Sequence, residues 1–136
     1  MENYKVRATE NTPEIDLNHT THSLMFSGDS RPEDVQKFYT PVMKWLDEYS
    51  NYLYFLKDKS SSPIEIKCEF KFEYFNSSSA KYVMDIINKL AEIENIGNNI
   101  GLKVNWYYEE MDEDMLEAGQ EFESMVNAEF NYIITG

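Results

Sequence analysis

The most regular pattern of apolar and polar residues runs through the middle of the chain, from Ile64 to Tyr74. Apolar side chains alternate there with charged ones in the sequence IEIKCEFKFEY. Successive side chains of a strand point to opposite faces, so the alternation predicts a strand with one buried face, ending at Tyr74, and one solvated face. After Asn76 the apolar residues recur at intervals of three and four, which predicts the buried stripe of a helix. That stripe consists of Val83, Ile86, Ile87, Leu90 and Ile93.

The chain before this stretch predicts further strands. Residues 1–11 are mostly polar, and we expect them to be flexible or to add a short edge strand. Ile15 and Leu17, followed by residues 22–27, predict two short strands joined as a hairpin.

A helix is predicted to start at Ser30. Ser30 and Glu33 fit the S-x-x-E capping box, and Pro32 falls in the first turn, where proline is tolerated. Pro41 lies within the following apolar pattern, so we expect it to kink the helix or to split off its first turns. The predicted buried residues are Val35, Phe38, Val42, Trp45, Leu46 and Tyr49.

The C-terminal part predicts a strand, a helix and a last strand. Residues 102–107 alternate, and residues 130–134 do the same over a shorter length. Between them, residues 112–126 predict a helix with acidic residues in its first turn. Its inward residues are expected to be Met115, Ala118, Phe122 and Met125.

The order of elements is therefore a β-hairpin followed by α, β, α, β, α, β. Alternating strands and helices imply a parallel core with right-handed crossovers. Strands buried on both faces usually read as continuous apolar runs, whereas these alternate. We therefore expect one domain over residues 1–136: a two-layer α/β fold, with a mixed, mostly parallel sheet and helices mainly on one face.

This topology places three polar segments at one edge of the sheet, where open α/β sheets tend to bind ligands: residues 28–31, 76–79 and 107–112. Asn76, Ser77, Ser78 and Ser79 lie where the predicted strand gives way to the helix. A helix N-terminus favours an anion, so a serine there is suited to carry a phosphate. Asn and Ser are also preferred capping residues, and the pattern alone leaves both interpretations open.

Composition narrows the classes of partner and compartment. A net charge of −13 argues against binding nucleic acid and against anionic membrane surfaces. The N-terminus has no apolar leader segment, and no run approaches the ~20 apolar residues of a membrane span. The single cysteine, Cys68, agrees with a reducing compartment. We therefore expect a cytoplasmic protein.

No residue pattern supports catalysis. His19 and His22 have no carboxylate or thiol at a useful spacing, and Cys68 belongs to the apolar face of its strand. The acidic residues 109–114 lack the register of a calcium loop and instead suit the first turn of a helix. Nucleotide-binding and hydrolase motifs are absent. We predict no catalytic residue, metal or cofactor, and not an enzyme; a small enzyme with scattered catalytic residues is the rival hypothesis.

Three segments carry a resemblance to a known family. They are GDSRPEDVQKFYTPVMKWLDEY at 28–49, IEIKCEFKFEYFNSSSAKYVMDIINKL at 64–90 and VNWYYEEMDEDMLEAGQEF at 104–122. Together they resemble the SiaC family of bacterial regulatory phosphoproteins, from about Thr12 to Ile133. The family fold is similar to the STAS domain of anti-sigma-factor antagonists, which carry a switch serine at the same strand-to-helix turn.

The resemblance implies a protein switch in cyclic di-GMP and biofilm signalling. In the family a Ser/Thr kinase phosphorylates the hydroxyl residue after the turn asparagine, and a PP2C-type phosphatase removes the phosphate. The unphosphorylated form binds and activates a diguanylate cyclase. The matching position here is Ser77, where a family member has Thr; Ser78 and Ser79 beside it leave the exact acceptor open.

Two further expectations accompany this one. Asn76 and Ser78 would hold the turn, and the same sheet edge would dock partners. The expected docking residues are Gly28, Asp29, Ser30, Arg31, Tyr107, Tyr108 and Glu109. The alternative is a constitutive STAS-like adaptor, or a partner-switch protein of the anti-sigma-factor-antagonist type with another effector.

Overall fold

The computed structural model describes residues 1–136, with six strands in one sheet and three helices. The strands are β1 (Tyr4–Val6), β2 (Glu14–Asn18), β3 (Ser23–Ser30), β4 (Ile64–Phe75), β5 (Ile100–Glu109) and β6 (Phe130–Thr135). The helices are α1 (Val35–Leu56), α2 (Ser77–Glu94) and α3 (Glu113–Ser124).

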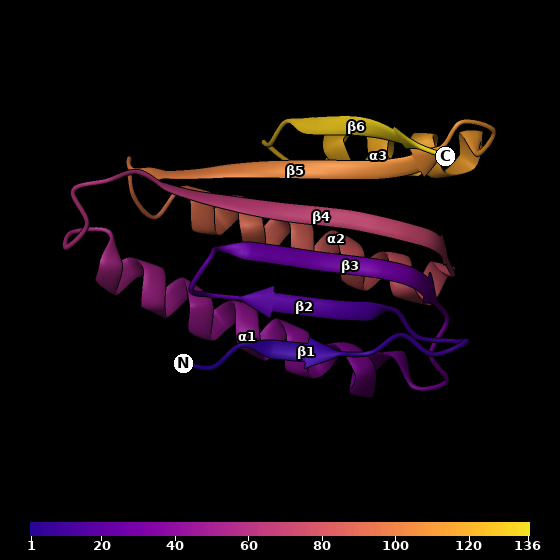
Figure 1. The fold of residues 1–136 in the computed structure, drawn as a ribbon, viewed down its shortest axis with the longest axis horizontal. Coiled ribbons are helices and arrows are strands. Elements are labelled where there is room, and N and C mark those ends of the chain that lie inside the picture. Colours follow the sequence, from indigo (N-terminus) through magenta and orange to yellow (C-terminus); the bar gives the residue numbers. More distant parts are fainter.

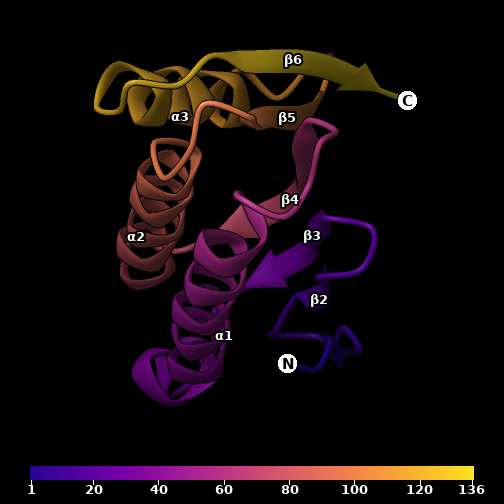
Figure 2. The ribbon, with the colours of Figure 1, turned by 90° about the vertical axis from the view of Figure 1, so that its left-hand side faces the viewer.

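The strands lie in the sheet in their order along the chain, from β1 to β6. β1, β2 and β3 pair antiparallel, and β3, β4, β5 and β6 pair parallel. Each parallel crossover moves to the next strand in the same direction, so crossovers of one hand place their helices on one face. Figure 1 looks onto the open face with the helices behind it, and Figure 2 shows the two layers from the side. The predicted two-layer α/β fold with an N-terminal hairpin is confirmed.

The core fills the space between the sheet and the helices. Phe26 of β3 stacks on Phe70 of β4 at 5.3 Å between ring centroids, and Phe70 contacts Trp106 of β5 at 5.5 Å. The whole predicted stripe of α2 is buried, which confirms that prediction: Val83, Ile86, Ile87, Leu90 and Ile93. Aromatic side chains from neighbouring strands therefore form a continuous layer beneath which the helices pack.

The predicted helix start at Ser30 is wrong. β3 continues to Ser30 because this residue pairs with Phe75 of β4. The helix begins at Val35, and its N-cap is Asp34, whose side chain accepts the N–H of Lys37 at 3.0 Å. The capping box was a coincidence of sequence, since pairing with a distant strand decides the conformation of Ser30.

Pro41 does not split α1, which runs through it without interruption from Val35 to Leu56. The residues on both sides of the proline, Tyr39 and Val42, pack into the core, and this packing holds the helix across the missing backbone donor. Val35 and Phe38 are only partly buried, contrary to the prediction. The fully inward residues are Tyr39, Val42, Trp45, Leu46, Tyr49 and Leu53.

The end of β4 departs from the predicted alternation. Tyr74 was expected to face the core but is 50% exposed. The pairing register with β3 shifts before Asp29, which leaves Glu73 as an extra residue in β4. One extra residue turns the following side chains to the opposite faces. Phe75 therefore points inward, with its ring 6.3 Å from that of Trp106.

Met125 was expected to face inward and is instead 65% exposed. α3 ends at Ser124, and Met125 is the C-cap residue, beyond the last inward position. Met115 and Phe122 are buried as predicted, and Ala118 packs against the core while partly exposed.

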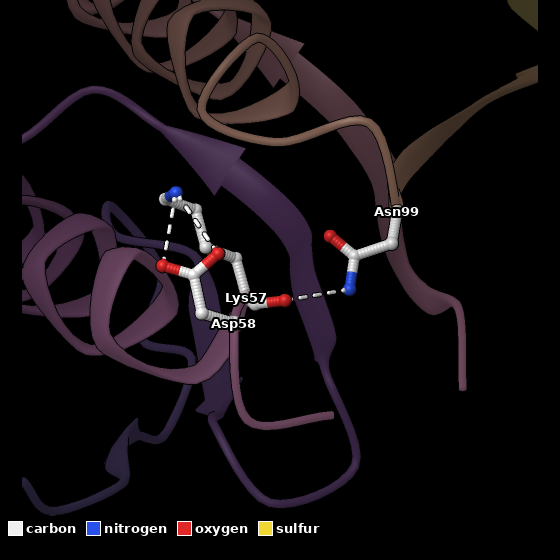
Figure 3. A network of polar contacts seen from close by, with 3 residues as sticks. All are labelled: Lys57, Asp58 and Asn99. Atoms are coloured by element: carbon white, nitrogen blue, oxygen red, sulfur yellow. Dashed lines mark hydrogen bonds and ion pairs between the residues drawn. The ribbon is translucent and has the colours of Figure 1, made fainter. Parts of the chain in front are cut away.

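The amino ends of β4 and β5 are held together by the loops that precede them. The Asn99 side chain donates to the Lys57 carbonyl at 3.1 Å, and the Asn99 carbonyl accepts the N–H of Ile64 at 2.7 Å. The Lys57 ammonium pairs with Asp58 at 3.3 Å (Figure 3). The loop after α1 is thereby tied to the loop before β5, and the two strands begin side by side.

Candidate functional site: the serine turn at the carboxyl edge of the sheet

The turn between β4 and α2 is fixed by Asn76. Its side-chain oxygen accepts the N–H of Ser79 at 2.9 Å, as an N-cap residue does. Its own N–H donates to the carbonyl of Ser30 at 3.0 Å, which ties the turn to the end of β3. The predicted turn residue Asn76 thus holds both the helix start and its position on the sheet edge.

The serines after Asn76 differ sharply in exposure. Ser77 and Ser78 are exposed, whereas Ser79 is 0% exposed. These residues occupy the first turn of α2, so their side chains point in different directions around the helix axis. Only Ser77 and Ser78 present a hydroxyl to a partner protein.

A buried chain of hydroxyls lies beneath the turn. Ser79 Oγ donates to the Ser30 carbonyl at 3.0 Å, and Ser30 Oγ donates to Ser79 Oγ at 2.8 Å. The Tyr39 hydroxyl lies 2.6 Å from Ser30 Oγ. Each hydroxyl has a single proton, and both serine protons are already placed, so Tyr39 donates to Ser30. The chain links α1, β3 and α2 in the interior.

Sequence reasoning missed this network. Ser30 was expected to cap a helix and to dock partners, yet it is fully buried and bonds to Tyr39 and Ser79. The one available signal was the position of Tyr39, three residues before Val42 on the apolar stripe of α1. Its bonding partners are distant in sequence, and no local pattern identifies them.

Burial raises the pKa of Tyr39 to about 12, although its hydrogen bonds with Ser30 and Ser79 act in the opposite direction. Its ring stacks on Tyr82 of α2 at 5.3 Å between centroids. Tyr39 is therefore a neutral hydrogen-bond donor at any physiological pH, and it packs against the helix that carries the serine turn.

We predict that Tyr39→Phe lowers the free energy of unfolding by about 1 kcal/mol at pH 8, because one buried hydrogen bond is lost. Between pH 10 and 12 the unfolded state releases the tyrosine proton while the folded state keeps it, so wild-type stability falls as pH rises. Phenylalanine has no proton to release, and the difference between the proteins should shrink to roughly zero near pH 11. Urea unfolding of wild type and Tyr39→Phe at pH 8 and pH 11 measures the difference in stability. A difference that does not change with pH would contradict the raised pKa of Tyr39.

The other predicted segments lie at the same edge. Arg31 is exposed just beyond β3, and its N–H donates to the Asn11 carbonyl at 2.8 Å. Gly28, with φ of +105°, and Asp29 are partly buried near the end of β3. Residues 107–109 end β5 at the same edge, beyond its pairing with β4. The parallel topology therefore brings the predicted docking residues to one edge, with Ser30 inside it rather than on its surface.

Tyr107 lies on the open face between two charged residues of β4. The neighbouring Glu69 carboxylate is the main cause that raises the pKa of Tyr107 to about 12. The Lys71 ammonium lies 4.9 Å from the centre of the Tyr107 ring, a cation–π distance. These contacts cross from β4 to β5 on the side away from the helices.

The histidines and the cysteine lie elsewhere. His22 Nδ1 is 2.6 Å from the Tyr49 hydroxyl, and the His19 ring contacts Tyr52 edge-on at 5.2 Å. Cys68 is fully buried, and burial raises the pKa of its thiol. No three acidic, histidine or cysteine side chains converge as metal ligands would. None of the helices is long and apolar enough to cross a membrane.

The fold and this turn define a two-layer α/β protein that presents exposed serines on a capped helix N-terminus at the carboxyl edge of its sheet. The model of the SiaC family, described as regulatory phosphoproteins, matches residues 6–135, and the chain belongs to this family. It is also 30% identical over 122 residues to an uncharacterised protein of Pseudomonas aeruginosa strain UCBPP-PA14. The aligned region covers 90% of this chain and 88% of that protein.

Solved structures agree on the fold. Apo-SiaC from Pseudomonas aeruginosa superposes with a TM-score of 0.80 at 22% identity, over 98% of this chain and 99% of that one. SiaC in its complex with the diguanylate cyclase SiaD, which it activates, gives 0.80 at 23% identity, over 97% and 99%. At such identities the likeness establishes the architecture.

Proposed function

We propose that this protein is a cytoplasmic, non-enzymatic switch that is phosphorylated on Ser77 and controls a diguanylate cyclase. Membership of a family of regulatory phosphoproteins and the cyclase complex of the relative SiaC support the proposal. The observation that carries it is the exposed Ser77 hydroxyl, directly after the capping Asn76 at the start of α2.

The backbone around Ser77 is suited to a phosphate. The first N–H groups of a helix have no helical partner. Those of Asn76 and Ser79 are bonded to Ser30 and to the Asn76 side chain, which leaves those of Ser77 and Ser78. Two free donors and the helix dipole stabilise an added anion, so phosphorylation should alter the surface and leave the core unchanged.

The chain's own part in the chemistry is to present a hydroxyl. The Ser77 oxygen attacks the γ-phosphorus of ATP, ADP leaves, and the serine proton passes to the base of a partner Ser/Thr kinase. A PP2C-type phosphatase restores the hydroxyl by hydrolysis. The phosphate adds about −1.5 to −2 charges and considerable bulk, which obstructs an effector surface fitted to the bare serine.

Intact-mass measurement tests the acceptor. The protein, Ser77→Ala and Ser78→Ala are each incubated with Mg-ATP and the kinase encoded beside the gene. We expect one added phosphate in wild type and in Ser78→Ala, and none in Ser77→Ala. A phosphate that persists in Ser77→Ala and disappears in Ser78→Ala would move the acceptor to Ser78. No phosphate on any of them, with a kinase proven active, would leave the turn as a cap alone.

The effector is tested separately with the cyclase of the same genome. We expect the unmodified protein to raise cyclic di-GMP production and Ser77→Asp to lose this effect. Ser77→Asp changes only an exposed position at a helix start, so circular dichroism should show an unchanged fold. Equal activation by both proteins would overturn control at Ser77.

A further inference from the structure

β4 and β5 separate at the carboxyl edge of the sheet. Their pairing runs from Ile64 and Ile100 to Phe70 and Trp106. Beyond that point β4 pairs only with β3, and β5 pairs only with β6, although both strands continue. Figure 1 shows the two strands drawing apart toward the right-hand edge. At the other end they are clamped through Asn99, so the opening is confined to the edge that carries the serine turn.

The separation opens a groove of about 470 Å³ on this edge. Lys71 and Glu73 line it from β4, and Tyr107, Tyr108 and Glu109 line it from β5, with Asp112 beyond. Phe72 of β4 adds an apolar side chain to the lining. The groove is thus a cleft at the strand ends whose walls carry three carboxylates, two tyrosines and one lysine.

The one lysine that lines the groove, Lys71, does not pair with its carboxylates. None of Glu73, Glu109 and Asp112 makes an ion pair. The Lys71 ammonium lies over the Tyr107 ring instead. The carboxylates do not converge as metal ligands would. Spread-out carboxylates beside tyrosine rings match the planar, multiply donating guanidinium of arginine better than a compact ion.

Exposed apolar side chains accompany the groove. Tyr74, which directly follows Glu73 in β4, is 50% exposed, and Met111, in the loop after β5, is 91% exposed. An aromatic and a flexible thioether beside an arginine-sized cleft are typical of protein–protein interfaces rather than of small-ligand sites.

We infer that this groove docks an arginine-bearing segment of the kinase that phosphorylates Ser77; the inference rests on the proposed function. Glu73 lies four residues before Ser77, so the chain between them spans at most about 14 Å. A kinase segment held in the groove therefore brings the active site of the kinase close to Ser77. The kinase fits the groove better than the effector does. Phosphorylation has to release the effector, but a phosphate added to an acidic edge would bind a basic effector segment more strongly.

Initial-rate kinetics with the kinase test the inference. Glu73→Gln/Glu109→Gln removes two carboxylates from exposed positions, whereas Asp112 is left intact because it caps α3. We expect KM for the protein substrate to rise about tenfold with kcat unchanged, since the lost contact is made equally in the bound and transition states. The effect should diminish at high salt.

The matched control is Glu48→Gln/Glu117→Gln, which makes the same change of charge on exposed helix positions with no ion pair. A groove variant with the KM of this control would overturn the inference while wild type is still phosphorylated. Lost affinity for the cyclase with an unchanged KM would assign the groove to the effector and also overturn it. A wild type that takes no phosphate would instead refute the proposed function itself.

Discussion

Replacing Ser79 with aspartate is expected to lower the free energy of unfolding by about 3–5 kcal/mol, whereas aspartate at Ser77 should change it by about 0.5 kcal/mol or less. Ser79 is 0% exposed, and its hydroxyl donates to the Ser30 carbonyl. A carboxylate there would face that acceptor with no donor proton and would lose its hydration. At Ser77 the charge is solvated and meets the favourable end of the helix dipole.

Urea unfolding at pH 7.5 measures both variants. Ser79→Ala is the control, with an expected loss of about 1–2 kcal/mol, because it removes hydrogen bonds without burying a charge. The comparison separates the buried, structural Ser79 from the exposed Ser77, which the sequence alone does not distinguish. Equal stability of Ser79→Asp and Ser77→Asp would show that the first turn of α2 opens easily and that Ser79 is accessible to a kinase after all.

The parts of the fold that local periodicity determines were predictable. The inward face of β4 up to Phe72 and the stripe of α2 follow from alternation and from the helical repeat. The capping role of Asn76 was among the interpretations, because residue type and position suffice for it. The docking edge was predictable in outline, since parallel strands end on the same side.

The errors arise where contacts distant in sequence decide the conformation. Ser30 extends a strand because it pairs with Phe75, which the sequence around Ser30 does not reveal. The same pairing contains the extra residue Glu73, and that residue turns Tyr74 outward. The hydroxyl chain to Tyr39 and the opening between β4 and β5 are likewise products of tertiary packing, so the buried half of the site appears only in the structure.

At Gly119, sequence and structure predict opposite changes in the free energy of unfolding when alanine replaces the glycine. Alanine in place of a glycine inside a helix normally gains up to about 1 kcal/mol. In α3, however, a Cβ at Gly119 would lie 2.6 Å from atoms of the Trp106 ring. Trp106 is fully buried and donates its indole N–H to the Met115 carbonyl at 2.9 Å, so the ring has no room to move and a bond to lose. We expect Gly119→Ala to lower the free energy of unfolding by about 2 kcal/mol.

Thermal and urea unfolding measure this effect, with Gly101→Ala in β5 as the control. A Cβ at Gly101 meets nothing within 4 Å, so that variant should keep its stability or gain a few tenths of a kcal/mol. The close approach of α3 also holds the Trp106 ring in the core, where it contacts Phe75. A stabilised Gly119→Ala would mean that α3 packs less tightly on β5 than a Cβ-to-ring distance of 2.6 Å implies.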